Sequence, residues 1–118
     1  MNKRAYGSAG EQSACEYLSA KGWKIIDRNV RCGRGEIDII AGKRGLTAFI
    51  EVKRRRNTAY GRPSEAVNAE KQRRIVQAAA LYMQENTLEN APVRFDIIEI
   101  LPGEIRHIEG AFDATDLF

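Results

Sequence analysis

The chain has 118 residues, of which 43% are hydrophobic, and it carries 19 Lys and Arg against 16 Asp and Glu. This length suits a single domain over residues 1–118, and the composition excludes a chain that is disordered throughout. A formal net charge of +3 does not by itself indicate a nucleic-acid partner, so the placement of the charges is more informative than their sum.

The hydrophobic pattern predicts, in chain order, a helix, three strands, a second helix and two further strands. The first helix is expected over residues 3–21 and the second from a cap at Ser64 or Asn68 to about Asn86. Pro102 and Gly103 form a turn before a short last strand, and an acidic tail from about residue 111 is expected to be loosely held. The expected strands are residues 23–30, 35–42, 46–55, 93–101 and 104–108.

The two cysteines lie outside any CxxC pair, and with one histidine they supply too few ligands for a zinc site. A reducing compartment is the simplest interpretation. Residues 1–10 contain no apolar run, and no segment approaches the roughly 20 apolar residues of a membrane span. We therefore expect a cytoplasmic protein without a membrane partner.

Three charged residues on two consecutive strands suggest chemistry. Strand alternation places Glu51 and Lys53 on one face of their strand, and an antiparallel hairpin with the preceding strand brings Asp38 close to them. Two carboxylates can hold a hard divalent cation such as Mg²⁺, and a lysine beside them can orient a water or stabilise charge on a phosphate. The alternative is a solvated face with cross-strand ion pairs. Glu36 shares the face of Asp38, where a supporting or surface role is favoured over that of a ligand.

Basic residues cluster in the middle of the chain. Arg54, Arg55 and Arg56 follow the predicted pocket directly, which favours contact with phosphates over the simple protection of a strand edge. Lys71 and Arg74 lie three residues apart on one face of the second helix, which suits either backbone contacts or a plain solvated surface. A basic surface around an acidic pocket fits a polyanionic substrate.

The ordered set of motifs resembles the PD-(D/E)XK nuclease superfamily, and more closely the YraN family of small bacterial proteins, which are regarded as similar to Holliday-junction resolvases. The resemblance covers nearly the whole chain and rests on GSAGE at 7–11, GRGEID at 33–38, FIEVK at 49–53, and the helix with Lys71 and Arg74 ahead of residues 78–80. One departure is Ile37, which stands where the superfamily label has a proline that is not a ligand.

The resemblance implies a restriction-endonuclease-like α/β fold with a mixed five-stranded sheet flanked by helices. It implies that Asp38 and Glu51 bind Mg²⁺ or Mn²⁺ and that Lys53 positions or activates the attacking water. Val52 would lend its backbone carbonyl to the metal, and Glu11 would complete the metal site. On the second helix, Lys71 or Gln72 would reach the phosphate.

The expected function is therefore a metal-dependent endonuclease that acts on branched or single-stranded DNA. It would contact the phosphate backbone with little sequence specificity. The sequence is compatible with a monomer or a homodimer. Two alternatives remain, namely a non-catalytic nucleic-acid-binding module on a nuclease fold and an interaction protein of a repair complex. Fold alone does not decide among the three.

Overall fold

The computed structural model describes residues 3–57, 59, 61–88 and 90–116. The predicted order of a helix, three strands, a helix and two strands is confirmed, with a short 3₁₀ turn added before the second helix and another after the last strand. In chain order the elements are α1 (Lys3–Ala20), β1 (Lys24–Cys32), β2 (Gly35–Lys43), β3 (Leu46–Arg54), η1 (Pro63–Ala66), α2 (Ala69–Glu85), β4 (Val93–Leu101), β5 (Glu104–Phe112) and η2 (Ala114–Asp116).

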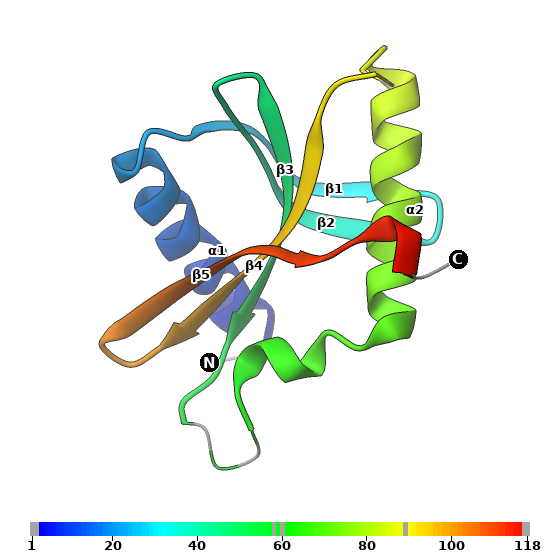
Figure 1. The fold of residues 1–118 in the computed structure, drawn as a ribbon. Coiled ribbons are helices and arrows are strands. Elements are labelled where there is room, and N and C mark those ends of the chain that lie inside the picture. The colour runs from blue at the N-terminus through cyan, green and yellow to red at the C-terminus, as the bar shows by residue number, and fades with distance from the viewer. Residues whose placement is uncertain (1–2, 58, 60, 89, 117–118) are drawn as a thin grey trace.

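All five strands belong to one sheet in the order β1-β2-β3-β4-β5. Neighbouring strands are antiparallel except for β3 and β4, which run parallel. A parallel pair needs a crossover connection, and η1 and α2 supply it here. The prediction of a mixed five-stranded sheet flanked by helices is confirmed, and the arrangement is compatible with the restriction-endonuclease-like fold (Figure 1).

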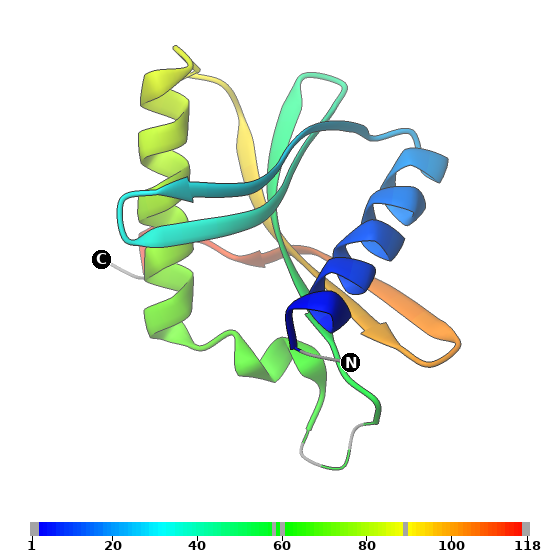
Figure 2. The same ribbon diagram turned by 180° about the vertical axis from the view of Figure 1, so that it is seen from behind.

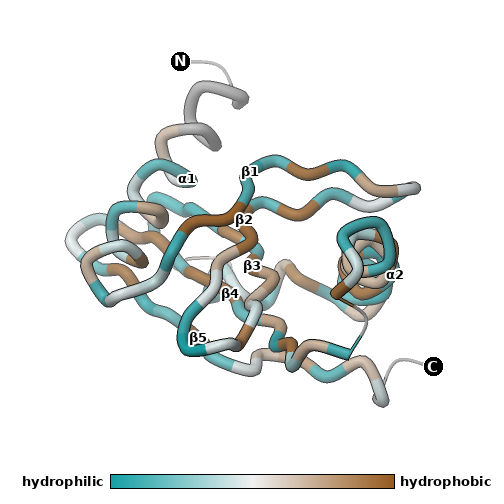
Figure 3. Tube along the Cα trace, turned by 90° about the horizontal axis from the view of Figure 1, so that it is seen from above, coloured by the Kyte–Doolittle hydropathy of each residue, from teal (hydrophilic) through white to brown (hydrophobic). Residues whose placement is uncertain are grey.

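The core lies in two layers, one on each face of the sheet. Ile75, Ala78 and Tyr82 of α2 pack on one face together with Phe49 of β3. Ala14, Cys15 and Leu18 of α1 pack on the other face, against Ala48, Ile50 and Ile98. Strand β3 is therefore buried on both faces, which explains its nearly continuous apolar sequence. Figure 2 shows α1 and α2 on either side of the strands, and Figure 3 shows brown, hydrophobic stretches recurring along the strands between them.

The start of α2 is fixed by its cap. Of the two caps predicted, Asn68 is the one used, because its side chain accepts a hydrogen bond from the backbone N–H of Lys71. Ser64 instead lies in η1. Gly35 at the start of β2 lies directly against α2, where a β-carbon would collide with the carbonyl oxygen of Arg74. The cap fixes where α2 begins, and the close approach of Gly35 to Arg74 fixes how near α2 lies to β2.

The C-terminal part of the chain differs from the prediction. Strand β5 continues to Phe112, whose ring stacks on Phe95 with centroids 5.2 Å apart. The expected tail from about residue 111 is therefore wrong for Ala111 and Phe112. The alternating pattern is interrupted at Gly110, which adopts a φ of 59° and donates its N–H to Asp96, and the pairing of β4 with β5 shifts register there. Such an irregularity hides the continuation of a strand from a period-two analysis. Within the described residues, no helix is long and apolar enough to cross a membrane.

Candidate active site

Asp38 and Glu51 lie where two paired strands begin to separate. The pairing of β2 with β3 runs from Lys43↔Leu46 to Ile39↔Ile50 and ends there. Just beyond that point the backbone N–H of Val52 donates to Asp38 Oδ2 at 2.8 Å, so a side chain replaces the next bond of the ladder. The hairpin thus brings Asp38 and Glu51 together, as the strand pattern predicts.

Burial makes this carboxylate pair unfavourable when both members are charged. Only 4% of Glu51 is exposed. Burial, and after it the charge of Asp38, raises the pKa of Glu51 to about 7. Burial also raises the pKa of Asp38, although the hydrogen bond from Val52 opposes this shift. Two like charges in a poorly solvated site repel unless positive charge compensates them.

Two lysines supply positive charge to Glu51. The Nζ atom of Lys53 lies 3.6 Å from Glu51 Oε1, and the Nζ atom of Lys71 lies 3.3 Å from the same oxygen. Lys53 follows on the same strand, as predicted. Lys71 comes from the first turn of α2, and its pairing with Glu51 was not predicted, because helical spacing gives no information on which strand residue a helix faces. The cap at Asn68 is the one local signal that could have placed Lys71 at the start of the helix.

Glu11 lies on α1, near enough to Asp38 for the two charges to interact. Its side chain is 16% exposed, and Arg28 Nη2 is 4.0 Å from its carboxylate. Burial and the charge of Asp38 raise the pKa of Glu11, whereas a hydrogen bond from the Asn29 side chain lowers it. A β-carbon at the neighbouring Gly10 would lie 3.4 Å from the side chain of Arg54, so α1 passes close to the end of β3 there. Sequence reasoning did not identify Asn29 as a neighbour of the pocket.

The donor set fits a hard divalent cation. Within the part of the chain that the structure describes, no three His, Cys, Asp or Glu side chains come close enough together to hold a metal ion by themselves. Asp38 and Glu51 therefore provide two carboxylates, which is the number Mg²⁺ commonly takes alongside waters and substrate phosphates. Because the N–H and C=O of one strand residue point to the same side, the Val52 carbonyl faces the side on which its N–H meets Asp38.

The basic residues predicted to contact nucleic acid have different surroundings. Arg55 is exposed and donates to the backbone carbonyl of Arg54. Arg74 pairs with Glu70 at 2.7 Å on the surface of α2. Gln72 donates to the carbonyl of Val67 before α2, so its amide NH₂ is engaged within the protein rather than directed at the pocket.

Two basic hollows lie near these residues. One, of about 480 Å³, is lined by residues of α2 and of the β1–β2 turn, namely Arg34, Glu70, Arg73, Arg74 and Gln77. Among the described residues, neither Arg34 nor Arg73 takes part in an ion pair. The other, of about 440 Å³, lies beyond the end of β3 and is lined by Arg55, Arg56, Asn57, Gly61, Arg62, Glu65 and Ala66. Both have the charge that a phosphate would require.

These features define an α/β protein with a mixed five-stranded sheet and a pair of carboxylates at the point where β2 and β3 stop pairing. The chain belongs to the uncharacterised protein family UPF0102, whose family model matches residues 10–100. It is 49% identical over 116 residues to a UPF0102 protein of Symbiobacterium thermophilum, covering 94% of this chain and 98% of the relative. It is 48% identical over 115 residues to a UPF0102 protein of Lachnoclostridium phytofermentans, covering 97% of this chain and 98% of the relative. The family description and these names state no activity.

Proposed function

We propose that this protein is a Mg²⁺- or Mn²⁺-dependent nuclease that hydrolyses phosphodiester bonds in DNA, in particular in branched or single-stranded structures. The observation that carries the proposal is the pair formed by buried Glu51 and half-buried Asp38, with Lys53 and Lys71 both directed at Glu51. A carboxylate pair with raised pKa values and a specific charged partner is typical of functional sites.

Each residue has a defined role in this proposal. Asp38 and Glu51 would hold the cation, with the backbone carbonyl of Val52 as a further ligand and Glu11 at the edge of the same site. A bound Mg²⁺ or Mn²⁺ supplies charge neutralisation at the phosphate and makes water more acidic. Lys53 places a positive charge beside Glu51, where it orients water and stabilises the negative charge that develops on the phosphate during hydrolysis.

The basic surface would hold the substrate. We assign phosphate contacts to Arg54, Arg55, Lys71 and Arg74, of which Lys71 also contacts Glu51. Gln72, the fifth residue expected from the sequence, would contact a phosphate only after giving up its bond to the Val67 carbonyl. Contacts of this kind position a nucleic acid without reading its bases. We therefore expect the protein to bind DNA in the cytoplasm with little sequence specificity. Whether it acts as a homodimer is measured directly by its mass in solution.

A panel of branched, flapped, single-stranded and duplex DNAs, incubated with Mg²⁺ or Mn²⁺, tests the proposal. The parent protein should cleave at least one of these substrates, and Asp38→Ala should abolish the cleavage. Glu109→Ala is the matched control, because Glu109 is a carboxylate on β5 that is 60% exposed and pairs with Arg94. Binding of DNA without cleavage under all metal conditions would reject the nuclease and support a non-catalytic binding module.

Metal binding is measured separately from cleavage. Titration calorimetry with Mn²⁺ should show binding that Asp38→Ala and Glu51→Ala each weaken at least about tenfold, as expected when one of two charged ligands is removed. Glu109→Ala should leave the affinity unchanged. Equal affinity in the parent and both pocket variants would place the metal elsewhere and remove the basis of the proposed mechanism.

A further inference from the structure

The turn between β1 and β2 packs closely on α2 and brings an arginine to the helix. Arg34 lies in this turn between two glycines. A β-carbon at Gly35 would collide with the carbonyl oxygen of Arg74. One at Gly33 would lie 3.0 Å from Cδ1 of Leu81. The two glycines therefore let the turn lie against α2, and Figures 1 and 2 both show it beside the helix.

This close packing forms one of the two basic hollows, of about 480 Å³, between the turn and the helix. It is lined by Arg34 from the turn and by Glu70, Arg73, Arg74 and Gln77 from α2. Glu70 pairs with Arg74 at 2.7 Å. Within the described part of the chain, neither Arg34 nor Arg73 takes part in an ion pair. Arg73 is nevertheless half-buried, and because burial of a charge without a partner is costly, the hollow favours an anion.

The other hollow, beyond the end of β3, has less positive charge to offer. Arg62, which lines it, donates to Glu99 and Glu104. Arg55 donates to the backbone carbonyl of Arg54. These arginines are therefore already engaged within the protein, whereas the two unpaired arginines of the hollow on α2 converge from different elements.

The hollow on α2 adjoins the candidate active site. Lys71 Nζ lies 3.3 Å from Glu51 Oε1, and Glu70, the residue before Lys71, lines the hollow. Lys71 and Arg74 are three residues apart, so they are neighbours on one face of the helix. Because every nucleotide of a DNA strand carries a phosphate, a strand that reacts at Glu51 would present another of its phosphates to the hollow.

We infer that this hollow binds a phosphodiester of the DNA strand close to the one hydrolysed at the Asp38–Glu51 pair, and that Arg34 and Arg73 hold it together. The inference rests on the proposed function for the chemistry of the strand. An arginine presents a planar fork of donors that matches the oxygens of a phosphate. A backbone contact of this kind fixes the register of a strand without reading its bases. The hollow would thus determine which bond of the strand lies at the carboxylates.

A double-variant comparison tests whether the two arginines share one phosphate. Affinity for a labelled single-stranded oligonucleotide is measured by fluorescence anisotropy, with Ca²⁺ in place of Mg²⁺. Arg34→Ala and Arg73→Ala should each weaken binding at least about tenfold, as expected when a hydrogen bond between charged groups is lost. The double variant should lose far less than the product of the two single losses. Losses that simply multiply would overturn the inference.

Arg44→Gly is the matched control, because it removes an arginine from the other hairpin turn, at the far end of β3 from Glu51. It should weaken binding little, and its effect should multiply with that of Arg34→Ala. Arg34→Lys should recover only part of the affinity, because an ammonium keeps the charge but lacks the fork. Full recovery in Arg34→Lys would reduce Arg34 to a point charge and contradict the shared grip on one phosphate.

A variant that gains affinity guards against loss through misfolding. Glu70→Gln removes the acidic side chain that lines the hollow and leaves Arg74 free to turn to a phosphate. Binding should become tighter by up to about fivefold, the range expected for a surface ion pair. Glu109→Gln removes an exposed carboxylate that pairs with Arg94 on β5, and it should not tighten binding. Equal gains in both variants would mean that net charge governs the affinity, and the hollow would not be a site.

The phosphate is also removed from the substrate. In a DNA that the parent protein cleaves, each phosphate near the cleaved bond is replaced in turn by an uncharged methylphosphonate. At one position the replacement should weaken binding to the parent about tenfold and cause no further loss in Arg34→Ala. If cleavage proceeds but no position behaves in this way, the inference is wrong and the proposed function stands.

Inorganic phosphate separates a strand from a free ion. If it binds to the parent more tightly than the oligonucleotide does, and Arg34→Ala abolishes this, the hollow is a site for the free ion and the inference fails. If the parent binds DNA but cleaves none, the proposed function fails, whereas the comparison of Arg34→Ala with Arg73→Ala still decides whether the two arginines share a phosphate. A parent protein that binds no DNA at all would overturn both.

Discussion

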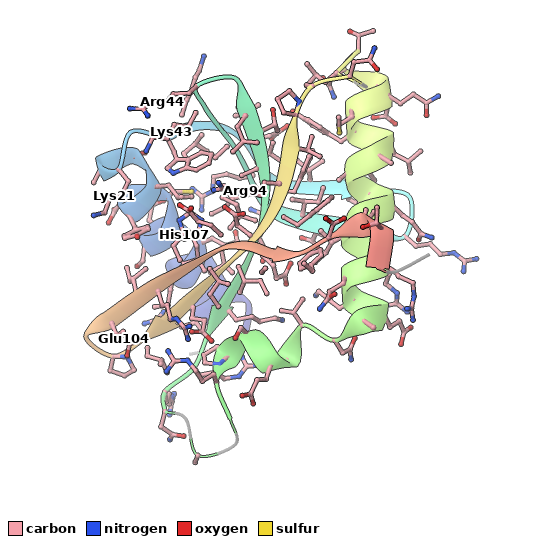
Figure 4. All side chains as sticks on the ribbon, in the orientation of Figure 1. Lys21, Lys43, Arg44, Arg94, Glu104 and His107 are labelled. Atoms are coloured by element: carbon pink, nitrogen blue, oxygen red, sulfur yellow. The ribbon has the colours of Figure 1, made fainter. Side chains whose placement is uncertain are left out.

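The molecule buries carboxylates in two regions that differ in how they are satisfied. On β4, Asp96 and Glu99 are 0% and 1% exposed. Asp96 receives hydrogen bonds from Arg94, His107 and the N–H of Gly110. Figure 4 shows Arg94 and His107 between α1 and the β4–β5 pair, where Asp96 reaches them.

The hydrogen bonds on β4 outweigh the effect of burial. Burial alone would raise the pKa of Asp96, but the bonds from His107, Arg94 and Gly110 lower it. Burial likewise acts to raise the pKa of Glu99, yet Ser64 and Arg62 lower it. Glu51 is almost as deeply buried, but its pKa is raised to about 7, because Asp38 adds to the effect of burial and the two lysines only partly oppose it.

Burial alone therefore does not identify a functional carboxylate. Asp96 and Glu99 are neutralised by partners that also tie β4 to β5 and to η1, as expected of structural residues. Asp38 and Glu51 repel one another and gain from an added cation. We propose from this comparison that the β4 region contributes stability and that the region between β2 and β3 carries the chemistry, and the four predictions that follow test this division.

The largest effect is expected from Lys53. Lys53→Ala removes a positive charge that acts mainly when charge develops on the phosphate, and such groups typically contribute ~10²–10³ in rate. Single-turnover cleavage should fall at least a hundredfold, whereas Mn²⁺ affinity should stay the same or rise because the pocket becomes more acidic. Lys53→Arg should restore little, since a guanidinium is planar and does not release a proton.

The control for Lys53 is Lys24→Ala, which removes an exposed lysine on β1. Its cleavage rate should equal that of the parent. Cleavage by Lys53→Ala at the parental rate would contradict the assignment of chemistry to this pocket and would favour the binding module.

The second prediction is a contrast in stability between two isosteric changes. Asp96→Asn removes the charge that Arg94 and His107 neutralise and should cost about 1–3 kcal/mol of unfolding free energy. Asp38→Asn removes a charge that repels Glu51 and keeps an oxygen for the Val52 N–H, so stability should be unchanged or higher. Urea denaturation of metal-free protein measures the unfolding free energy of both variants. An equal loss in the two would show that the carboxylates of the two regions contribute to stability in the same way.

The third prediction concerns pH. The pKa of Asp96 is lowered from its ordinary value of 3.8, so its contribution to stability is complete above pH 3.8 and is lost as the pH falls below that value. The pKa of Glu51 is raised from 4.5 to about 7, so its contribution is complete below pH 4.5 and is lost as the pH rises to about 7.

Denaturation midpoints of metal-free protein should therefore fall at both ends of this range. Asp96→Asn should flatten the acid side of the profile, and Glu51→Gln should flatten the side between pH 4.5 and about 7. If the denaturation midpoint of Glu51→Gln fell with pH as steeply as that of the parent over this interval, ionisation of Glu51 would not lower the stability of the fold, and the prediction would be wrong.

Most of the fold could be predicted from the sequence because its elements have regular periods. Strand alternation placed Asp38 and Glu51 on neighbouring strands, and the apolar positions of α2 followed helical spacing. The failures occur where the backbone leaves these periods. Gly110, at a φ of 59°, hid the end of β5, and Asn29, at a φ of 52°, leaves the extended conformation within β1.

Contacts between elements that are far apart in the sequence also could not be predicted. The pairing of Lys71 with Glu51 depends on how α2 lies on the sheet, which the close approach of Gly35 to Arg74 helps to fix. The hollow formed by Arg34 and Arg73 joins a turn and a helix that are far apart in sequence. Periodicity describes each element separately and carries no information on such packing.

The smallest effect is expected when single basic residues are removed, and it is measured as a change in the salt dependence of DNA binding. Basic residues at the two ends of β3 provide the comparison. Arg55 and Arg73 line the two basic hollows. Arg44 lies in the β2–β3 turn, at the far end of β3 from Glu51, next to Lys43, whose Nζ donates to the backbone carbonyl of Lys21 (Figure 4). Each phosphate contact that is removed should lower the salt slope of DNA binding by about one.

Arg55→Ala and Arg73→Ala should therefore each reduce the slope of log affinity against log salt concentration by about one, and binding to DNAs of different sequence should fall in parallel. Arg44→Gly removes the same charge and should leave the slope unchanged, because a distant charge contributes to the overall field without displacing a counterion from the bound strand. An equal reduction in all three variants would mean that net charge, rather than a defined path past the acidic pocket, governs the binding of DNA. A loss confined to one sequence would instead indicate that these arginines read bases.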